Sequence, residues 1–352
     1  MQSGRLADAI KSLRENDRDI HALVVLRNCR MVVELYAERV TRDHNHAVYS
    51  VTKSVVATMA GVLLRNGKLS SLDTPVADIV AAGTLDAEKL AKARRIRLRD
   101  VMSMASGLEY RHDPANHPIY AAADRFQFAL GPAFIDEPGR RFNYSDGDAS
   151  IAGAVVAAAA ATDLLSYGND VLFGPLGFKN VEWWFRDKAG RYAGGWGLRL
   201  RAVDMAKFGQ LYLQNGRWQD KAIIDAGFVG DAWKPSAAAP QYGLFWWRWV
   251  REDPRVGPVH FANGFKGQRI YVLPKHGIII VVSANVAGAD QAYAALVRAV
   301  VSAVQSDRPI EPSTSDADRL AEQLRLPFSG KPGHALSKSG QDFPRLNGVS
   351  LR

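Results

Sequence analysis

In the first 65 residues, the apolar positions have first the spacing of a helix and then that of β-strands. A largely apolar segment typical of a buried helix follows. Residues 4–15 have helical spacing, and the valine- and leucine-rich residues 21–26 and 31–36 flank the turn Arg27-Asn28-Cys29-Arg30. Residues 51–65 contain mainly Val, Ala, Leu and Met with no proline, and Asn66-Gly67 supplies a helix stop. The pattern predicts a helix, a β-hairpin and a buried helix, in that order.

The middle of the chain has a mainly helical pattern, and the last third returns to strands. Between residues 69 and 214, helices are expected at 81–93, 99–104, 151–165 and 202–214, with Gly and Pro loops between them. Further along, strands are expected at 245–250, 267–273 and 277–283, followed by an amphipathic helix at 291–304.

This order of elements predicts an α+β fold with two lobes. We expect an α/β lobe from residues 1–68 and 190–306 and a mostly helical lobe from residues 69–189. The tail, 307–352, is rich in Pro, Ser and Gly apart from residues 317–324, which predicts a loosely packed C-terminal extension.

Composition places the chain among ordinary globular proteins. Its 352 residues are 47% hydrophobic and 23% charged, which is enough for a sizeable core. No apolar run reaches the roughly 18 residues that a membrane span requires. Residues 1–20 lack the apolar stretch of a secretory signal, which favours a cytoplasmic location, or a periplasmic one if the N-terminus was trimmed. The sequence carries no signal for the oligomeric state.

Charge and cysteine content exclude several classes of function. The net charge is +9, but the basic residues form short, separated clusters without a recognition motif, so nucleic-acid binding is not expected. The single Cys29 excludes an intrachain disulfide and a cysteine metal cluster. No H-E-x-x-H motif occurs, and the eight histidines form no ligand-spaced set, so no metal is expected.

Ser50 and Lys53 form an S-x-x-K motif at the start of the predicted buried helix. Unpaired N–H groups and the positive end of the helix dipole favour developing negative charge at Ser50, while Lys53 lies one turn on, on the same face. A serine hydroxyl needs a neighbouring base, and a lysine can serve if its pKa is lowered. An N-cap serine followed by a surface lysine would give the same spacing, so the motif alone does not decide.

Two other segments carry candidate chemistry. Tyr144, in Phe142-Asn143-Tyr144-Ser145-Asp146, heads a turn before a helix and could hold or shuttle the serine proton. The glycine-dotted segment around Asn263 and Gly264 leads into a strand, where the backbone N–H of Phe265 could join that of Ser50 in a two-donor oxyanion hole. A nucleophile elbow G-x-S-x-G is absent, which argues against an α/β-hydrolase.

With these segments in place, residues from about 20 to 305 resemble the serine β-lactamase and penicillin-binding-protein-like superfamily. The similarity is to the class C and CubicO-type branch, which contains family VIII esterases, D-aminopeptidases and 6-aminohexanoate-dimer hydrolases. It is carried by motifs in family order: Tyr49-Ser50-Val51-Thr52-Lys53-Ser54, Leu72-Asp73-Thr74-Pro75-Val76, Glu137-Pro138-Gly139, Phe142-Asn143-Tyr144-Ser145-Asp146, Gly174-Pro175-Leu176-Gly177-Phe178 and Gly194-Gly195-Trp196-Gly197-Leu198.

The resemblance implies an antiparallel sheet flanked by helices, a mostly helical lobe, and a cleft between them. It implies Ser50 as nucleophile, Lys53 as activating amine and Tyr144 as proton shuttle, with no cofactor. Two departures change the expectation. Asp146 stands where the family usually has asparagine and, if ionised, would favour a protonated Lys53. Ala262 stands where β-lactamases and DD-peptidases have a carboxylate-binding lysine.

The sequence therefore predicts a serine hydrolase that acts on a small, neutral ester or amide through an acyl-enzyme. Substrate-binding residues are expected to be Asp146, Asn263, Gly264, Tyr242 and Trp246. Whether Lys53 or Tyr144 is the main base stays open. Two alternatives also stay open: β-lactamase, D-alanyl carboxypeptidase or D-aminopeptidase activity, and a catalytically weak binding module of the same fold.

Overall fold

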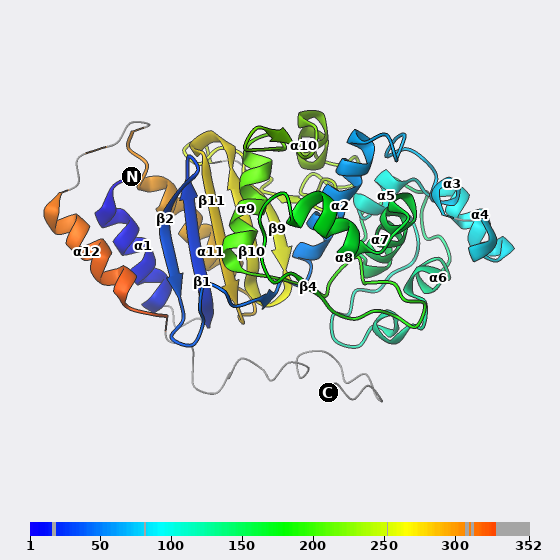
Figure 1. The fold of residues 1–352 in the computed structure, drawn as a ribbon, viewed down its shortest axis with the longest axis horizontal. Helices are drawn as coiled ribbons and strands as arrows, with labels where there is room; N and C mark the ends of the chain where they lie inside the picture. Colours follow the sequence, from blue (N-terminus) through cyan, green and yellow to red (C-terminus); the bar gives the residue numbers. More distant parts are fainter. Residues whose placement is uncertain (16–18, 81, 252, 307–309, 311–312, 329–352) are drawn as a thin grey trace.

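A six-stranded antiparallel sheet occupies the centre of the computed structural model (Figure 1). The structure describes residues 1–15, 19–80, 82–251, 253–306, 310 and 313–328. The strands lie in the order β2-β1-β11-β10-β9-β8, so an N-terminal hairpin is joined to strands from the last third of the chain. Their bounds are β1 Ile20–Arg27, β2 Arg30–Tyr36, β8 Trp247–Arg248, β9 His260–Gly264, β10 Gln268–Leu273 and β11 Ile278–Ala284.

Strand β11 shows why the sheet is central. Its sequence IIIVVSA is buried at every position, as expected for a strand covered on both faces. Alternate side chains point to opposite faces, and they join two separate cores. Ile279 and Val281 pack into one core with the helices α2 (Val51–Arg65) and α9 (Ala202–Leu213). Ile278, Ile280 and Val282 pack into the other core with α1 (Ser3–Glu15) and α11 (Asp290–Ser302).

Helices from the middle of the chain gather at the end of the molecule opposite α1 and α12 (Thr314–Arg325), and α2 lies between them and the sheet (Figure 1). Helix α2 contacts both α7 and β9. The helices of this group are α3 Val76–Ile79, α4 Ala87–Arg95, α5 Leu98–Met102, α6 Arg125–Ala129, α7 Asp146–Ala160 and α8 Leu164–Gly168.

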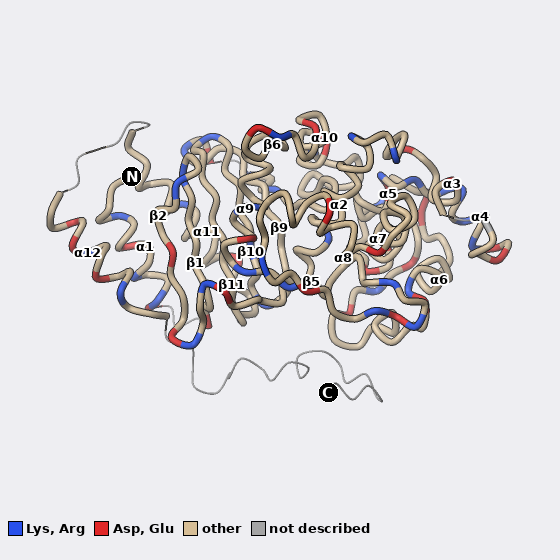
Figure 2. The backbone as a smooth tube through the Cα atoms, viewed as in Figure 1, with Lys and Arg blue, Asp and Glu red and all other residues tan. Residues whose placement is uncertain are grey.

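Short elements complete the described chain. They are the strands β3 His46–Ala47, β4 Glu182–Trp183, β5 Leu198–Leu200, β6 Arg217–Trp218 and β7 Lys221–Ala222, the helix α10 Ala226–Trp233, the 3₁₀ turns η1 Ala82–Thr84, η2 Pro118–Ala121, η4 Phe265–Gly267 and η5 Pro274–His276, and the π-helical η3 Asn169–Phe173. Basic and acidic side chains are interspersed along the whole molecule (Figure 2).

Among the described residues, no single helix is long and apolar enough to cross a membrane. A bent pair, Asp146–Ala160 with Leu164–Phe173, reaches that length and composition together. Most of α7 is buried within the protein core, which accounts for its apolar composition.

The α+β prediction is confirmed, together with the N-terminal helix, the hairpin and the buried helix after Ser50. The strand predicted at 245–250 is wrong in extent, because β8 covers two residues. Phe245 has a φ of 57° in the left-handed region, which an extended strand cannot accommodate. The helix predicted at 81–93 begins later, at Ala87, because the Asp86 side chain accepts a hydrogen bond from the Lys89 N–H and caps it there. The helix predicted at 151–165 begins at Asp146 and ends at Ala160.

The C-terminal extension is not loosely packed over residues 313–328. Helix α12 lies against α1, and Phe328 is 1% exposed in the core that α1 and α11 share. The Phe328 N–H donates to the carbonyl of Tyr36, and the Phe328 carbonyl accepts from Glu38, so the segment adds to the edge of β2. Residues 329–352 lie outside the described chain. The division into two lobes stays a prediction.

Replacing Phe328 with alanine should lower the free energy of unfolding by about 3 kcal/mol, because a buried phenyl ring leaves a cavity. Urea denaturation followed by tryptophan fluorescence measures this. Leu326→Ala is the matched control, since Leu326 is 45% exposed in the same segment and its loss should change stability by less than about 0.5 kcal/mol. Equal effects of the two substitutions would show that the segment does not dock as described.

Candidate active site

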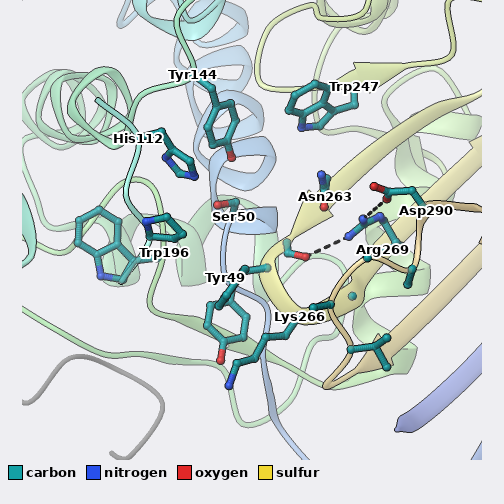
Figure 3. Close-up of a pocket in the computed structure, with 18 of the residues that line it drawn as sticks. Tyr49, Ser50, His112, Tyr144, Trp196, Trp247, Asn263, Lys266, Arg269 and Asp290 are labelled. Atoms are coloured by element: carbon teal, nitrogen blue, oxygen red, sulfur yellow. Dashed lines mark hydrogen bonds and ion pairs between the residues drawn. The ribbon is translucent and has the colours of Figure 1, made fainter. Parts of the chain in front are cut away.

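Ser50 lies at the N-terminus of α2 and lines a cavity of about 480 Å³. The lining is largely aromatic and includes Tyr49, Tyr120, Tyr144, Trp196, Trp247 and Phe265. The strand residues Asn263 and Gly264 also line the cavity, and Asn263 lies across it from Tyr144 and Ser50 (Figure 3). Among the described residues, the Ser50 N–H donates no hydrogen bond to a backbone carbonyl. That N–H is therefore available to a group in the cavity.

The backbone before Ser50 is tightly held. Tyr49 has a φ of 47°, an uncommon conformation for a residue with a side chain. The Val48 N–H donates to the carbonyl of Leu198 in β5. On the other side, a Cβ on Gly264 would lie 2.3 Å from the Val48 carbonyl oxygen, so only glycine lets the end of β9 approach so closely. The turn at Ser50 is thus fixed between β5 and β9.

Lys53 is 1% exposed, and its Nζ lies within hydrogen-bond distance of three oxygen atoms. It is 3.0 Å from Ser50 Oγ, 2.6 Å from Asp146 Oδ1 and 3.0 Å from the Gly195 carbonyl oxygen. An ammonium has three N–H donors, and the carboxylate and carbonyl can only accept. Two donors are therefore committed, and the remaining position on Nζ faces Ser50.

Asp146 is the counter-ion of Lys53. Burial alone would lower the pKa of Lys53, but the charge of Asp146 and the proximity of Tyr144 outweigh it, so the pKa lies above its usual value. Burial would likewise raise the pKa of Asp146, but the charge and hydrogen bond of Lys53 and the hydrogen bond of Tyr120 hold it below its usual value. The two residues form a buried ion pair, which is the condition under which the sequence analysis expected a protonated Lys53.

Two glycines bring the Gly195 carbonyl to Lys53. A Cβ on Gly195 would lie 2.9 Å from Asp146 Oδ1 and 3.1 Å from Lys53 Nζ, inside the ion pair itself. A Cβ on Gly194 would lie 2.1 Å from the carbonyl oxygen of Ala149 in α7. The backbone of this segment can therefore lie against α7 only because neither residue has a side chain.

Tyr144 points its hydroxyl toward Ser50 across the cavity (Figure 3). The Lys53 Nζ lies 5.1 Å from the centre of the Tyr144 ring, and the ring of His112 meets it edge-on at 5.2 Å. The structure thus brings Ser50, Lys53 and Tyr144 together in one place.

Phe265 and its neighbours form the opposite wall. Phe265 directly follows β9 and lines the cavity with Asn263 and Gly264, while its side chain is 48% exposed at the mouth and contacts Tyr49 edge-on. Ala262 is fully buried and faces the core with α2. The strand therefore presents an amide side chain and backbone groups at this position, with no cationic side chain at residue 262.

Tyr242 and Trp246 do not line the cavity, contrary to the prediction. Both are 1% exposed, and Trp246 packs against Phe208 and Tyr212 in the core. The left-handed backbone at Phe245 breaks the alternation expected of a strand, so Trp247 reaches the cavity instead. Tyr242 supports that wall from behind, with its ring 4.7 Å from Trp247.

Sequence reasoning missed Tyr120, Trp196 and the Gly195 carbonyl. Tyr120 Oη donates to Asp146 Oδ2 at 2.8 Å, yet it comes from a 3₁₀ turn with no motif around it. The Gly194-Gly195 pair was recognised as a motif. The contact of Gly195 with Lys53 is made by a backbone carbonyl, however, and the spacing of side chains in the sequence does not reveal it. In the described part of the chain, no three His, Cys, Asp or Glu side chains are grouped to hold a metal ion.

Asp148 lies two residues after Asp146, but its pKa is shifted in the opposite direction. It is 2% exposed and accepts hydrogen bonds from Ser106 Oγ at 2.6 Å and from the Ser106 N–H at 3.3 Å. Burial without a cationic partner outweighs these bonds and raises the pKa of Asp148 to about 7. This carboxyl ties the loop before α6 to the turn that carries Tyr144.

A family model described as Beta-lactamase matches residues 6–305. No curated protein sequence matches the chain.

Solved structures of this fold are similar over most of the chain. A proposed 6-aminohexanoate-dimer hydrolase from Bacillus anthracis has a TM-score of 0.71 and 19% identity, over 83% of this chain and 81% of that one. EstCE1, a hydrolase with promiscuous acyltransferase activity, has a TM-score of 0.67 and 19% identity, over 85% and 99% of the two chains. A beta-lactamase from Mycobacterium bovis has a TM-score of 0.61 and 20% identity, over 84% and 98%. At these identities the similarity shows the fold.

Asp148→Asn should gain stability relative to the wild type as the pH rises. The folded-state pKa of Asp148 is raised, so the stability it contributes is present below about pH 4 and is lost as the pH rises through about 7. Asparagine does not titrate, so the difference in unfolding free energy between variant and wild type should shift toward the variant by at least about 1 kcal/mol from pH 5 to pH 8. Urea denaturation at both pH values tests this. A difference that stays constant with pH would contradict it.

Proposed function

Because the chain belongs to the beta-lactamase family, we propose that it is a serine hydrolase that cleaves a small ester or amide through an acyl-enzyme on Ser50. The observation that carries the proposal is the buried contact between Lys53 Nζ and Ser50 Oγ at 3.0 Å, at the floor of the aromatic cavity. A buried lysine held against a serine at a helix N-terminus is the arrangement that nucleophilic catalysis by serine requires.

In the first half-reaction, Ser50 Oγ attacks the substrate carbonyl carbon, and the carbonyl oxygen takes up the negative charge. The N–H groups of Ser50 and Phe265 would hold this oxyanion. The proton from Oγ passes through the Lys53 and Tyr144 pair to the leaving group, whose bond to the carbonyl carbon breaks. In the second half-reaction, water attacks the ester on Ser50, gives its proton to the same pair, and releases the acid and the serine.

A neutral substrate is supported by the walls of the cavity. Aromatic rings supply much of the lining, and Ala262 places no positive charge on the strand opposite Ser50. Two cationic side chains, Lys266 and Arg269, also line the cavity, and the Arg269 guanidinium is paired with Asp290 at 2.6 Å and bonded to the Gly264 and Gln268 carbonyls. The similar structures named as a 6-aminohexanoate-dimer hydrolase and as a hydrolase with promiscuous acyltransferase activity are consistent with such substrates.

Ser50→Ala should abolish hydrolysis, lowering kcat for p-nitrophenyl esters by about a thousandfold or more. A fluorophosphonate probe should add its mass to the Ser50 peptide of the wild type and leave the variant unlabelled. Ser70→Ala is the matched control, since Ser70 is exposed beyond the end of α2 and should retain wild-type activity. Hydrolysis that survives unchanged in Ser50→Ala would exclude the mechanism.

Substrate preference should follow the missing charge at residue 262. In a panel of p-nitrophenyl esters, small linear amides, D-amino-acid amides and nitrocefin, we expect kcat/KM for the best ester to exceed that for nitrocefin by about a hundredfold or more, because no lysine holds the β-lactam carboxylate. Nitrocefin as the best substrate would favour the β-lactamase alternative. Failure with every substrate, together with no fluorophosphonate labelling, would favour a binding module.

A further inference from the structure

Both oxygens of the Asp146 carboxylate are engaged inside the protein. Oδ1 accepts from Lys53 Nζ at 2.6 Å, and Oδ2 accepts from Tyr120 Oη at 2.8 Å. The Asp146 side chain is 7% exposed, so little of it reaches the cavity. Both carboxylate oxygens of Asp146 are thus bonded to protein groups, whereas the sequence predicted that Asp146 would bind substrate.

Lys53 has the acceptors that an ammonium needs. Its three N–H groups can reach the Asp146 carboxylate, the Gly195 carbonyl and Ser50 Oγ, so the charged form is fully hydrogen-bonded in a buried place. A buried charge persists when it is both paired and hydrogen-bonded, and otherwise the group loses its proton. Here both conditions are met by contacts of 2.6 to 3.0 Å.

We propose that Asp146 and Tyr120 are positioning residues that keep Lys53 protonated at neutral pH, so that Lys53 serves Ser50 as a fixed hydrogen-bond donor and positive charge and is not the proton acceptor. Asp146 supplies the charge, and the Tyr120 hydroxyl holds the carboxylate in place and favours its ionised form. The catalytic consequence rests on the proposed function. The protonation state of Lys53 does not, and it can be measured separately.

The other titratable groups around the pair do not compete with Asp146 for this role. Burial lowers the pKa values of His112 and His117, so both imidazoles are neutral near pH 7. Burial raises the pKa values of Tyr110 and Tyr242, so both phenols stay neutral. Tyr144 also raises the pKa of Lys53, but by less than Asp146 does. Asp146 is therefore the main source of the negative charge that faces Lys53.

The direct test is the titration of Lys53 by NMR with ¹³Cε-labelled lysine, the signal being assigned through Lys53→Arg. In the wild type, Lys53 should not titrate between about pH 5 and about pH 9. In Asp146→Asn, burial is no longer opposed by a carboxylate, so Lys53 should lose its proton within that range. A wild-type Lys53 that titrates near neutral pH, or one whose titration is unchanged in Asp146→Asn, would overturn the proposal.

Tyr120→Phe tests the second positioning residue and keeps the proposal testable if Asp146→Asn does not fold. Loss of one hydroxyl should raise the pH at which Asp146 titrates by about one unit, read from its ¹³C carboxyl shift. Tyr167→Phe is the matched control, because Tyr167 also loses a buried hydroxyl, one that has no hydrogen-bond partner among the described residues. A Tyr120→Phe titration identical to that of Tyr167→Phe would remove Tyr120 from the proposal.

The pH dependence of kcat/KM is a further test, because a purely structural role of Asp146 would not change it. With a p-nitrophenyl ester, kcat/KM of Asp146→Asn should gain an alkaline limb, falling about tenfold between about pH 6 and about pH 8 as Lys53 loses its proton and with it the positive charge beside Ser50, whereas wild type should lack this limb. The double variant Asp146→Asn with His112→Gln should keep the limb, which separates Lys53 from His112. A limb lost with His112 would count against Lys53. If no ester is hydrolysed, the proposed function fails while the NMR titrations still decide this inference.

Discussion

The ion pair of Lys53 and Asp146 is the interaction around which the site is built. Moving an ammonium out of water costs several kcal/mol, and attraction to a carboxylate offsets this only with close contact and complete hydrogen bonding. Here each remaining requirement is met by a different element. The N-terminal turn of α7 holds Asp146, a 3₁₀ turn supplies Tyr120, and the Gly194-Gly195 segment supplies a carbonyl. Ser50 lies where these elements meet, so the contacts that satisfy the buried charges also fix the position of Ser50.

The electrostatics of α7 show how closely spaced residues can differ. Asp146 and Asp148 both lie in its first turn, where the helix dipole favours carboxylates. Asp146 faces a cation and has a lowered pKa, whereas Asp148 faces hydroxyl and N–H groups and has a raised one. Asp146 is part of the ion pair beside the cavity, whereas Asp148 is part of an uncharged hydrogen-bond network behind it. The direction in which each side chain leaves the helix decides the difference.

What the sequence could reveal follows from how local each signal is. Ser50 and Lys53 are one helical turn apart, and the hairpin, α2, α9 and β11 each carry their own apolar period, so these were predictable. Tyr120 reaches Asp146, and the Gly195 carbonyl reaches Lys53, from segments distant in sequence, and nothing in their own neighbourhoods marks these contacts. The prediction that Tyr242 and Trp246 line the cavity was wrong for a physical reason. The left-handed backbone at Phe245 changes which tryptophan faces the cavity, and the alternation of side chains in a predicted strand does not reveal such a turn. The packing of Phe328 on β2 was likewise hidden by a polar tail.

The strand order has a consequence for how the protein is made. Strand β1 precedes its neighbour β11 by some 250 residues, so β1 is synthesised long before its partner. Until then, the hairpin exposes an apolar strand with an unpaired edge, which is a template for association with other chains. Among the strand pairs of the six-stranded sheet, the pairing of β1 with β11 is the most distant in sequence, so folding is expected to be slow for a protein of this size. The sheet that supports the cavity can therefore close only after β11 has been synthesised, and β1 must stay free of other partners until then.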